Sequence, residues 1–326
     1  MRAHLLLLLT CCLAAPLPYD GLVRPQADGS AVAYMAPPNA ANHASTIEQL
    51  PGGALLLAWF SGTKEEADKC AIVVSRLPPG GAQWTAPETV SERDGFSNQN
   101  PVLFHDASTN VTWLFHSQLA AGAGEGLDTL WALQSADGGV SWTKPAVFLD
   151  LTKESKGVFD RNRIIPRADG SLLFPLYWTT TGPPNAPFML FSEPSDHSKW
   201  GKPADVKNAD NLVQPTVVRT SSATLTAFFR DRKSRSVFGA DSADEGLTWT
   251  TPTPTRAGNL PNNVSRSPTP RALGARACSS LHLSPLQHTH TTPHATLNRT
   301  RALRPFSWPL ERPFCCSTTP RRTARP

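Results

Sequence analysis

Several residue types are scarce in this sequence, and each shortage excludes a class of protein. Of the six cysteines, Cys70 is the only one between residues 16 and 263, so no disulfide framework is readable. No apolar run approaches the roughly 18 residues of a membrane-spanning helix, and we expect no membrane span. The chain has three Tyr against 31 Pro, 21 Gly and nine Trp. Short apolar runs broken by Pro and Gly predict many strands joined by tight turns and exclude a helical bundle.

Lys and acidic residues are nearly absent from the last 63 residues. Residues 264–326 contain ten Arg, no Lys and a single acid, Glu311, and so carry +9, whereas residues 1–263 carry −4. The positive net charge belongs to this tail, so we do not expect a nucleic-acid partner for the whole chain. The tail is rich in Arg, Pro, Thr, Ser and His, a composition that buries too little apolar surface to order itself. We therefore predict a disordered tail over 264–326 and interpret it as the product of an altered reading frame or a retained intron.

The first 15 residues have the composition of a targeting segment. Arg2 supplies a positive charge, residues 5–13 are mostly apolar, and Ala14 and Ala15 are small residues suited to cleavage. This pattern predicts a signal peptide over 1–15 and places the protein in the secretory pathway.

The body of the chain repeats itself four times. A Trp followed three residues later by Pro recurs at intervals of 58, 58 and 49 residues, and a polar start followed by an apolar strand recurs in phase with it. The Trp series is Trp84, Trp142, Trp200 and Trp249, and the polar starts begin at His43, Gln99, Arg161 and Gln214. A period of about 50 residues with about four strands in each unit predicts the blades of a β-propeller.

Two of the Trp residues end a recurring turn sequence. Residues 135–142 read Ser-Ala-Asp-Gly-Gly-Val-Ser-Trp, and residues 242–249 read Ser-Ala-Asp-Glu-Gly-Leu-Thr-Trp. In each turn the Asp can accept backbone N–H bonds, the Gly can adopt positive φ, and the Trp can pack between blades. We therefore expect structural roles, not catalytic ones, for Asp137, Gly139, Trp142, Asp244, Gly246 and Trp249.

These turns match the Asp box, and with the blade starts they make residues 43–263 resemble the BNR-repeat sialidase (neuraminidase) family. The branch with a His-Ala-x-Thr-Ile opening is the most similar, and the strand end at 229–232, Phe-Arg-Asp-Arg, also matches. The resemblance implies an all-β, six-bladed-type propeller of the sialidase fold over 20–263, of which about four blades are legible. It also implies a secreted glycoside hydrolase that removes terminal sialic acid or a similar acidic sugar from glycoconjugates.

The polar starts of the blades predict where a ligand binds. In a propeller the first strand of each blade lines the central axis, so polar residues at the starts of these strands meet at one end of it. Any one of them could simply cap a strand, but unpaired polar residues at four corresponding places are costly unless a polar ligand occupies the axis. The set comprises His43, Gln99, Asn100, Arg161, Asn162, Arg163 and Gln214.

The resemblance also implies particular catalytic roles. It places an acid/base Asp on the loop after residues 55–60, where Asp68 is the best match, although a solvated charge run explains Asp68 equally well. Arg230 matches one Arg of the cluster that binds the sugar carboxylate. This sequence has His43 and Thr63 where the family has Arg, and it has no acid at 212–214 to support a nucleophile. The Tyr nucleophile and the third Arg fall in blades that are not legible, so we expect impaired activity.

Two other functions remain open at this point. The chain could be a non-catalytic carbohydrate-binding propeller, or a polysaccharide lyase in which His43 abstracts the proton. In each case the expected partner is a sialylated or other acidic glycan, with no cofactor and no metal site. Residues 31–35 are interpreted as an N-terminal closing strand whose blade is missing, which predicts an open arc of four blades with two unpaired faces.

Overall fold

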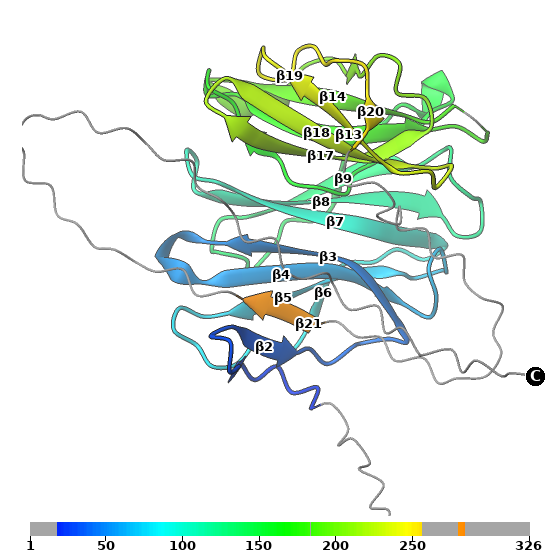
Figure 1. Ribbon diagram of the computed structural model, residues 1–326. Coiled ribbons are helices and arrows are strands. Elements are labelled where there is room, and N and C mark those ends of the chain that lie inside the picture. Colours follow the sequence, from blue (N-terminus) through cyan, green and yellow to red (C-terminus); the bar gives the residue numbers. More distant parts are fainter. Residues whose placement is uncertain (1–17, 183, 256–279, 284–326) are drawn as a thin grey trace, which may run out of the picture. The chain divides into compact units, whose positions relative to one another are not determined.

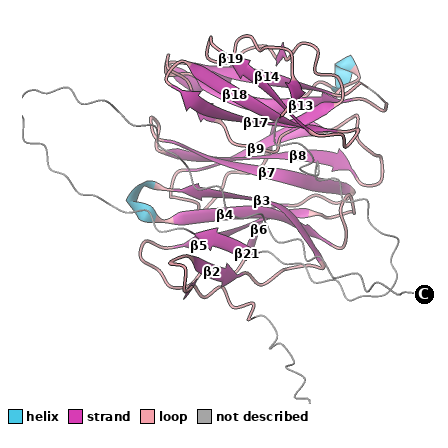
Figure 2. Ribbon diagram, in the orientation of Figure 1, coloured by secondary structure: helices cyan, strands magenta, loops and turns pink. Residues whose placement is uncertain are grey.

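The computed structural model describes residues 18–182, 184–255 and 280–283. Four antiparallel sheets follow one another along residues 41–254 as the blades of a β-propeller (Figure 1). The described helices are two short 3-10 turns, Pro51–Gly53 and Thr152–Glu154, and neither is long or apolar enough to cross a membrane (Figure 2). The all-β prediction is therefore confirmed. Residues 1–15, predicted to be a signal peptide, lie outside the described residues.

The blades are formed by consecutive stretches of the chain. The first contains β3 (Ala41–Gln49), β4 (Leu55–Gly62), β5 (Ala71–Leu77) and β6 (Glu88–Ser91). The second contains β7 (Phe96–Asp106), β8 (Val111–Ala120), β9 (Thr129–Ser135) and β10 (Ala146–Leu149). The third contains β11 (Gly157–Phe159), β12 (Ile165–Pro166), β13 (Leu172–Thr179), β14 (Ala186–Glu193), β15 (Asp196–Trp200) and β16 (Ala204–Asp205). The fourth contains β17 (Leu212–Ser221), β18 (Thr224–Asp231), β19 (Val237–Ser242) and β20 (Thr253–Pro254).

Apolar side chains fill the space between neighbouring blades. Leu56 and Phe60 of the first blade pack with Leu114 of the second, and a corresponding cluster joins the second blade to the third through Phe115 and Phe174. The central strands of each blade are buried on both faces, which explains the nearly continuous apolar runs of β4 and β13. Each fully buried Leu or Phe contributes about 1.5–3 kcal/mol of hydrophobic stabilisation.

The first strand of every blade is interrupted at the same place. The register with the second strand shifts beside Ala44 (φ 57°), Asn100 (φ 51°) and Gln214 (φ 53°), and in the third blade the interruption is complete because residues 160–164 separate β11 from β12. These bulges change the alignment that the sequence predicted: Gln214 occupies the position of Asn100, and Val213 occupies that of His43 and Gln99. The third blade also divides its outer edge into β15 and β16, so it has six strands where the repeats predicted about four.

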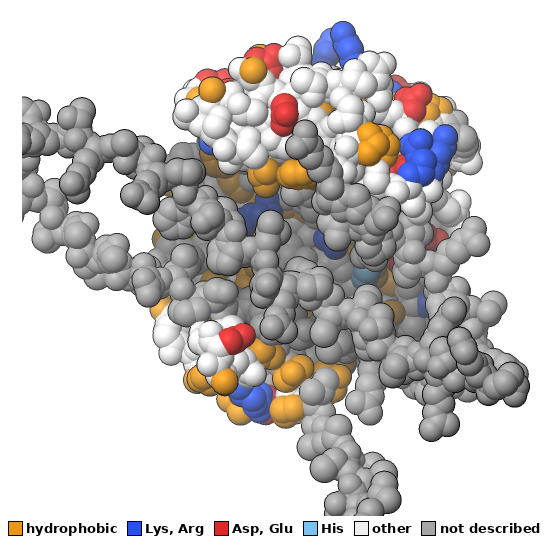
Figure 3. All heavy atoms as spheres, in the orientation of Figure 1, with side chains coloured by type: hydrophobic (Ala, Val, Ile, Leu, Met, Phe, Trp, Pro, Cys, Tyr) orange, Lys and Arg blue, Asp and Glu red, His pale blue; other side chains and the backbone are white. Residues whose placement is uncertain are grey.

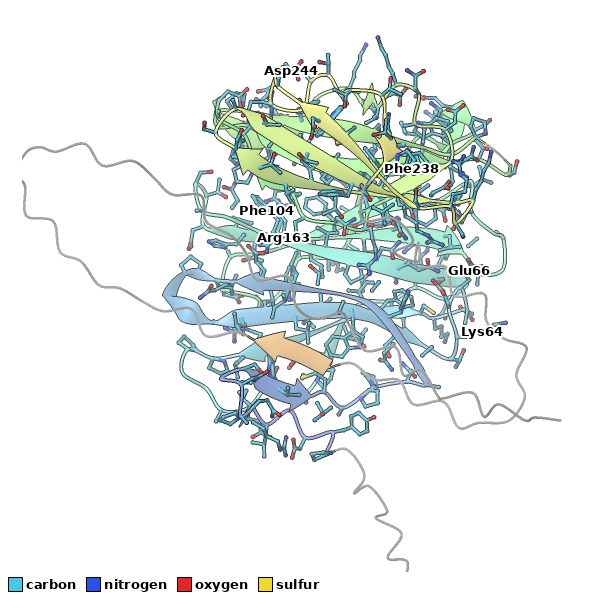
Figure 4. The ribbon with its side chains drawn as sticks, in the orientation of Figure 1. Lys64, Glu66, Phe104, Arg163, Phe238 and Asp244 are labelled. Carbon is cyan, nitrogen blue, oxygen red and sulfur yellow. The ribbon has the colours of Figure 1, made fainter. Side chains whose placement is uncertain are left out.

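The two ends of the blades carry different connections. Gly62 pairs with Ala41 and Asp231 pairs with Leu212, so the loop after each second strand lies beside the start of the first. We call this end, with residues 63–70, 121–128, 180–182, 184–185 and 232–236, the loop end. The opposite end carries the hairpins between the first two strands and the turns 135–143 and 242–250, and we call it the turn end. In Figure 4, Lys64 and Glu66 lie at the loop end, on the right, and Asp244 lies at the turn end.

A separate three-stranded sheet lies beside the first blade. It consists of β1 (Arg24–Pro25), β2 (Ala31–Tyr34) and β21 (Ser280–Leu283), with Ala31 opposite Leu283. Ala33 and Met35 pack on Trp59 of the first blade, and hydrophobic side chains gather at this lowest part of Figure 3.

This sheet corrects one expectation from the sequence. The strand expected at 31–35 is present, but it pairs with β1 and β21, and it covers a face of the first blade that we expected to be unpaired. Strand β21 lies within residues 264–326, the tail predicted to be disordered. The rest of that tail lies outside the described residues.

Candidate functional site

Charged side chains from all four blades converge at the loop end. The 63–70 loop supplies Glu65 and Glu66, and the side chain of Arg232, which follows β18, is ion-paired with Glu125 of the 121–128 loop. The carboxylate of Glu66 interacts electrostatically with Glu125 and Arg232, and the guanidinium of Arg161 interacts electrostatically with Glu65. With two buried acids described next, these residues form what we call the loop-end cluster: Glu65, Glu66, Glu125, Asp128, Asp160, Arg161 and Arg232.

The two buried acids hold protons unusually tightly. Asp160 Oδ1 accepts a hydrogen bond from Ser117 Oγ at 2.6 Å, Oδ2 has no partner among the described residues, and burial raises the pKa of Asp160 to about 8. Asp128 Oδ2 accepts the Gly126 N–H at 3.0 Å, and burial, reinforced by the nearby charge of Glu125, raises the pKa of Asp128 to about 7. Both carboxyl groups can therefore act as hydrogen-bond donors near neutral pH.

Three arginines contribute donors at this end. The side chain of Arg161 is half-buried and makes no hydrogen bond to another described residue, and burial lowers its pKa. The Nε atoms of Arg230 and Arg232 are buried without a hydrogen-bond partner among the described residues. Unused guanidinium donors in a partly buried setting favour a planar anion such as a carboxylate.

The remaining polar starts lie at or beside the bulges. His43 is exposed and meets Phe60 edge-on, with ring centroids 5.5 Å apart, whereas Gln99 and Asn100 are buried. Gln99 Nε2 donates to Ser97 Oγ at 3.4 Å. Asn162 Nδ2 donates to the carbonyls of Gln214 and Pro215, each at 3.0 Å, so Asn162 joins the third blade to the fourth.

Arg163 is directed away from the loop-end cluster. Its Nη2 lies 2.6 Å from Oε2 of Glu48, which is near the other end of β3. Burial raises the pKa of Glu48, and the charge of Arg163 opposes that shift. In Figure 4, Arg163 lies near Phe104 and well apart from Glu66. The structure therefore separates Arg163 from Arg161, with which the sequence grouped it.

Asp68 lies on the same loop as Glu66 but has a different partner. It is exposed, and its Oδ1 accepts the N–H of Gly95 at 2.6 Å. Glu66 has φ 62°, and burial followed by the charges of Glu125 and Glu65 raises its pKa. Sequence reasoning missed Glu66 because residues 64–68 read as a solvated charge run.

Tyr177 does not have the setting of a ready nucleophile. It is buried, its ring stacks on Phe159 at 5.3 Å, and it is hydrogen-bonded to Gln214. Burial raises the pKa of Tyr177, which keeps the hydroxyl protonated. Among the described residues, no group of three or more His, Cys, Asp or Glu is arranged to hold a metal ion.

The two repeated turns have almost identical hydrogen bonds at the turn end. Asp137 Oδ1 accepts the N–H groups of Val140 and Ser141 at 3.0 and 2.9 Å, and hydrogen bonds, first from the Ser141 hydroxyl, lower the pKa of Asp137. Asp244 Oδ1 likewise accepts the Thr248 N–H at 2.9 Å. The neighbouring side chains pack between blades: Trp142 against the cluster of the first two blades and Trp249 against that of the last two. Gly139 and Gly246 have φ of 79° and 89°.

Comparison with known proteins identifies the family. A profile of the BNR repeat-like domain matches residues 53–270. No curated protein matches the chain in sequence.

Solved structures show the same fold. A Hadza microbial sialidase has a TM-score of 0.54 at 19% identity, over 64% of this chain and 46% of that one. A leech intramolecular trans-sialidase has a TM-score of 0.57 at 14% identity, over 67% of this chain and 51% of that one. An intramolecular trans-sialidase from Ruminococcus gnavus has a TM-score of 0.56 at 14% identity, over 66% of this chain and 71% of that one. The match thus spans about half the length of the first two proteins. The profile match covers most of the described blades, and the chain belongs to the family of BNR repeat-like domains, with the β-propeller fold of sialidases.

Proposed function

We propose that this protein is a sialidase-type carbohydrate-active propeller of the secretory pathway that binds a terminal acidic sugar, sialic acid or a similar one, at the loop end. The observation that carries the proposal is the pairing of unused arginine donors with two buried, proton-holding acids, Asp128 and Asp160, at one end of the blades. Such a site offers positive donors to a carboxylate and neutral donors to hydroxyl groups. The likeness in fold to sialidases supports the same substrate class.

The arginines would hold the sugar carboxylate. Arg161 and Arg230 each present planar N–H groups that can bind a carboxylate through two parallel hydrogen bonds, which a Lys cannot do. Arg232 is already ion-paired with Glu125, so its role is to keep that acid from repelling the ligand.

Either Asp68 or Glu66 would transfer the proton to the glycosidic oxygen. Asp68 matches the resemblance, and the Gly95 N–H fixes its carboxylate while leaving Oδ2 available. Glu66 has the raised pKa that a general acid needs. Comparing Asp68→Asn with Glu66→Gln would separate them, because only the true proton donor shows a turnover defect that shrinks for substrates with a good leaving group.

Turnover in this chain should be weak relative to binding. His43 stands where the resemblance expects an Arg, residues 212–214 contain no acid, and Tyr177 is buried and protonated. A covalent intermediate on Tyr needs an activated phenolate, whereas burial keeps the Tyr177 hydroxyl protonated. We therefore propose impaired hydrolysis with retained recognition of the sugar.

The experiment is to measure sialic acid binding and the release of 4-methylumbelliferone from its sialoside with the full-length secreted protein. Arg161→Lys keeps the charge but removes the planar fork, and it should weaken sialic acid binding by about tenfold or more, the value of one charge-assisted hydrogen bond. Arg219→Lys, at the turn end, is the matched control. Failure of the wild-type protein to bind sialic acid, or equal binding by Arg161→Lys, would reject the proposal.

An exposed histidine supports a second candidate. His43 is the one polar blade start in the described chain that combines exposure with a titratable ring, and it lies at the loop end. In a polysaccharide lyase it would abstract the proton next to a uronate carboxylate. Ultraviolet absorbance of an unsaturated uronate, produced by the wild type and lost in His43→Gln, would favour this function over hydrolysis.

We also propose that the Asp137 and Asp244 turns serve as structural Asp boxes. Both oxygens of each carboxylate accept hydrogen bonds from donors of their own turn, which fixes the turn. Their distance from the loop end along the strands supports the same role.

A further inference from the structure

A cavity of about 390 Å³ lies between the second and third blades at the turn end. Its walls come from the hairpin between β7 and β8, from Trp113 of β8 and Gln134 of β9, and from the turn between β14 and β15. A cavity of this size is in the range of pockets that hold small organic ligands. It lies at the opposite end of the blades from the loop-end cluster, so it does not depend on the function proposed above.

One wall combines an aromatic ring with a free amide. Trp113 and Gln134 are directly opposite each other on β8 and β9, so their side chains lie next to each other on the same face of the sheet. Trp113 stacks on Phe115, with ring centroids 5.6 Å apart, which fixes the indole orientation. The side-chain amide of Gln134 makes no hydrogen bond to another described residue. This pair offers an apolar surface beside one donor and one acceptor.

The facing wall is polar but already hydrogen-bonded. Asp106 accepts bonds from Ser108, Thr109 and His197, and His197 lies 2.9 Å both from Asp106 and from the carbonyl of Gly170. Asp196 is bonded to Ser198 and ion-paired with Lys199. The wall is therefore held rigid without the ligand.

The charges of the lining determine the class of ligand. Two carboxylates, Asp106 and Asp196, line the cavity against a single His197, and no Lys or Arg lines it. An anionic sugar would be repelled, whereas a neutral sugar can place its apolar C–H face on Trp113 and its hydroxyl groups on Gln134.

We propose that this cavity is a second carbohydrate site, specific for a neutral monosaccharide or disaccharide unit. It would hold a part of the glycan other than the acidic terminal sugar, or a separate neutral glycan. Neither the ligand nor the residues are shared with the loop end.

The test is binding of methyl β-galactoside, methyl β-glucoside and N-acetylglucosamine to the full-length protein, measured by calorimetry and by saturation-transfer NMR, with glucuronic acid as the anionic comparison. We expect at least one neutral sugar to bind and glucuronic acid not to bind. Gln134→Leu should weaken binding of the neutral sugar by about fivefold, which corresponds to the loss of one hydrogen bond. Gln49→Leu, an exposed Gln on β3 away from the cavity, is the control.

A second pair of variants guards against unfolding. Trp113→Phe keeps the stacking on Phe115 and should weaken binding, whereas Trp131→Phe on β9 should not, since Trp131 is hydrogen-bonded to Thr129 and does not line the cavity. Absence of binding by all three neutral sugars, stronger binding of glucuronic acid, or equal effects of Gln134→Leu and Gln49→Leu would overturn the proposal. Loss of sialic acid binding by Arg161→Lys would leave it intact.

Discussion

His197 joins the second and third blades at the turn end, and replacing it with Gln tests how much that junction contributes. Its side chain is 11% exposed, and both ring nitrogens lie 2.9 Å from acceptors, the Asp106 carboxylate and the Gly170 carbonyl. Only an imidazolium can donate from both nitrogens. His197→Gln removes the charge and at least one of the two bonds, so we expect a loss of about 1–3 kcal/mol in the free energy of unfolding at acidic pH.

The loss should depend on pH in a defined direction. Burial by itself would lower the pKa of His197, but hydrogen bonds to Gly170 and Asp106 outweigh it and raise the pKa above the ordinary 6.5. The folded state therefore binds the proton more tightly than the unfolded state. The resulting stability is fully present below pH 6.5 and disappears as the pH rises through the folded-state pKa. Nearby charges that contribute are Asp106, Asp196 and, through Asp196, Lys199.

Urea denaturation of wild type and His197→Gln across this range measures the effect, with His43→Gln as a control because His43 is exposed and has no carboxylate partner in the described part of the chain. The difference in unfolding free energy between wild type and His197→Gln should be largest below pH 6.5 and shrink as the pH rises above that value. A difference that is constant with pH, or that grows as the pH rises, would refute the doubly bonded imidazolium.

Three further predictions concern the turns and the buried acid. Asp137→Ala should lower the free energy of unfolding by about 1 kcal/mol through lost side-chain to backbone bonds without changing sialic acid binding; a selective loss of binding would contradict the structural role. Gly139→Ala should lower the melting temperature more than Asp137→Ala, because φ is 79° and the new Cβ would lie 2.8 Å from Leu56 Cδ1; an unchanged melting temperature would show that the turn can relax. Asp160→Asn resembles the protonated acid, so it should match wild type in stability near pH 4 and exceed it as the pH rises toward 8, because the raised pKa of Asp160 makes its ionisation in the folded state costly. Denaturant unfolding at both pH values measures the difference. Lower stability of the variant at high pH would show that the charge of Asp160 is compensated in the folded protein.

The fold could be predicted from the sequence because it repeats. Four Trp residues in register with four polar starts reveal blades before any contact is known, and the Asp137 and Asp244 turns depend only on residues within eight positions of each other. Local, periodic features of this kind can be recognised from the sequence alone. The extra strands of the third blade were not predicted, because the separation of β11 from β12 depends on where residues 160–164 insert among neighbouring blades.

The candidate site was only partly predictable for the same reason. Arg161 and Arg163 are two positions apart and look equivalent in sequence, but Arg163 pairs with Glu48, 115 residues away. Asp160 and Asp128 owe their raised pKa to burial, which no pattern in their own segments indicates. Asp68 was selected by its match to a motif, whereas the electrostatic coupling of Glu66 appears only once the 63–70 and 121–128 loops lie next to each other.

The bulges in the first strands allow one strand to present polar and apolar side chains to two different surfaces. Side chains alternate between the faces of a strand, so one inserted residue reverses which face the following side chains occupy. Ala44, Asn100 and Gln214 are such insertions, and they let a strand carry its polar residues toward the axis before the bulge and its apolar residues toward the neighbouring blade after it. A left-handed backbone at a residue other than glycine costs about 1–2 kcal/mol, so the three positions together oppose folding at the end where the ligand is proposed to bind. Glycine at these positions would relieve that cost, although at Ala44 it would also remove a methyl group from the apolar cluster of the first two blades.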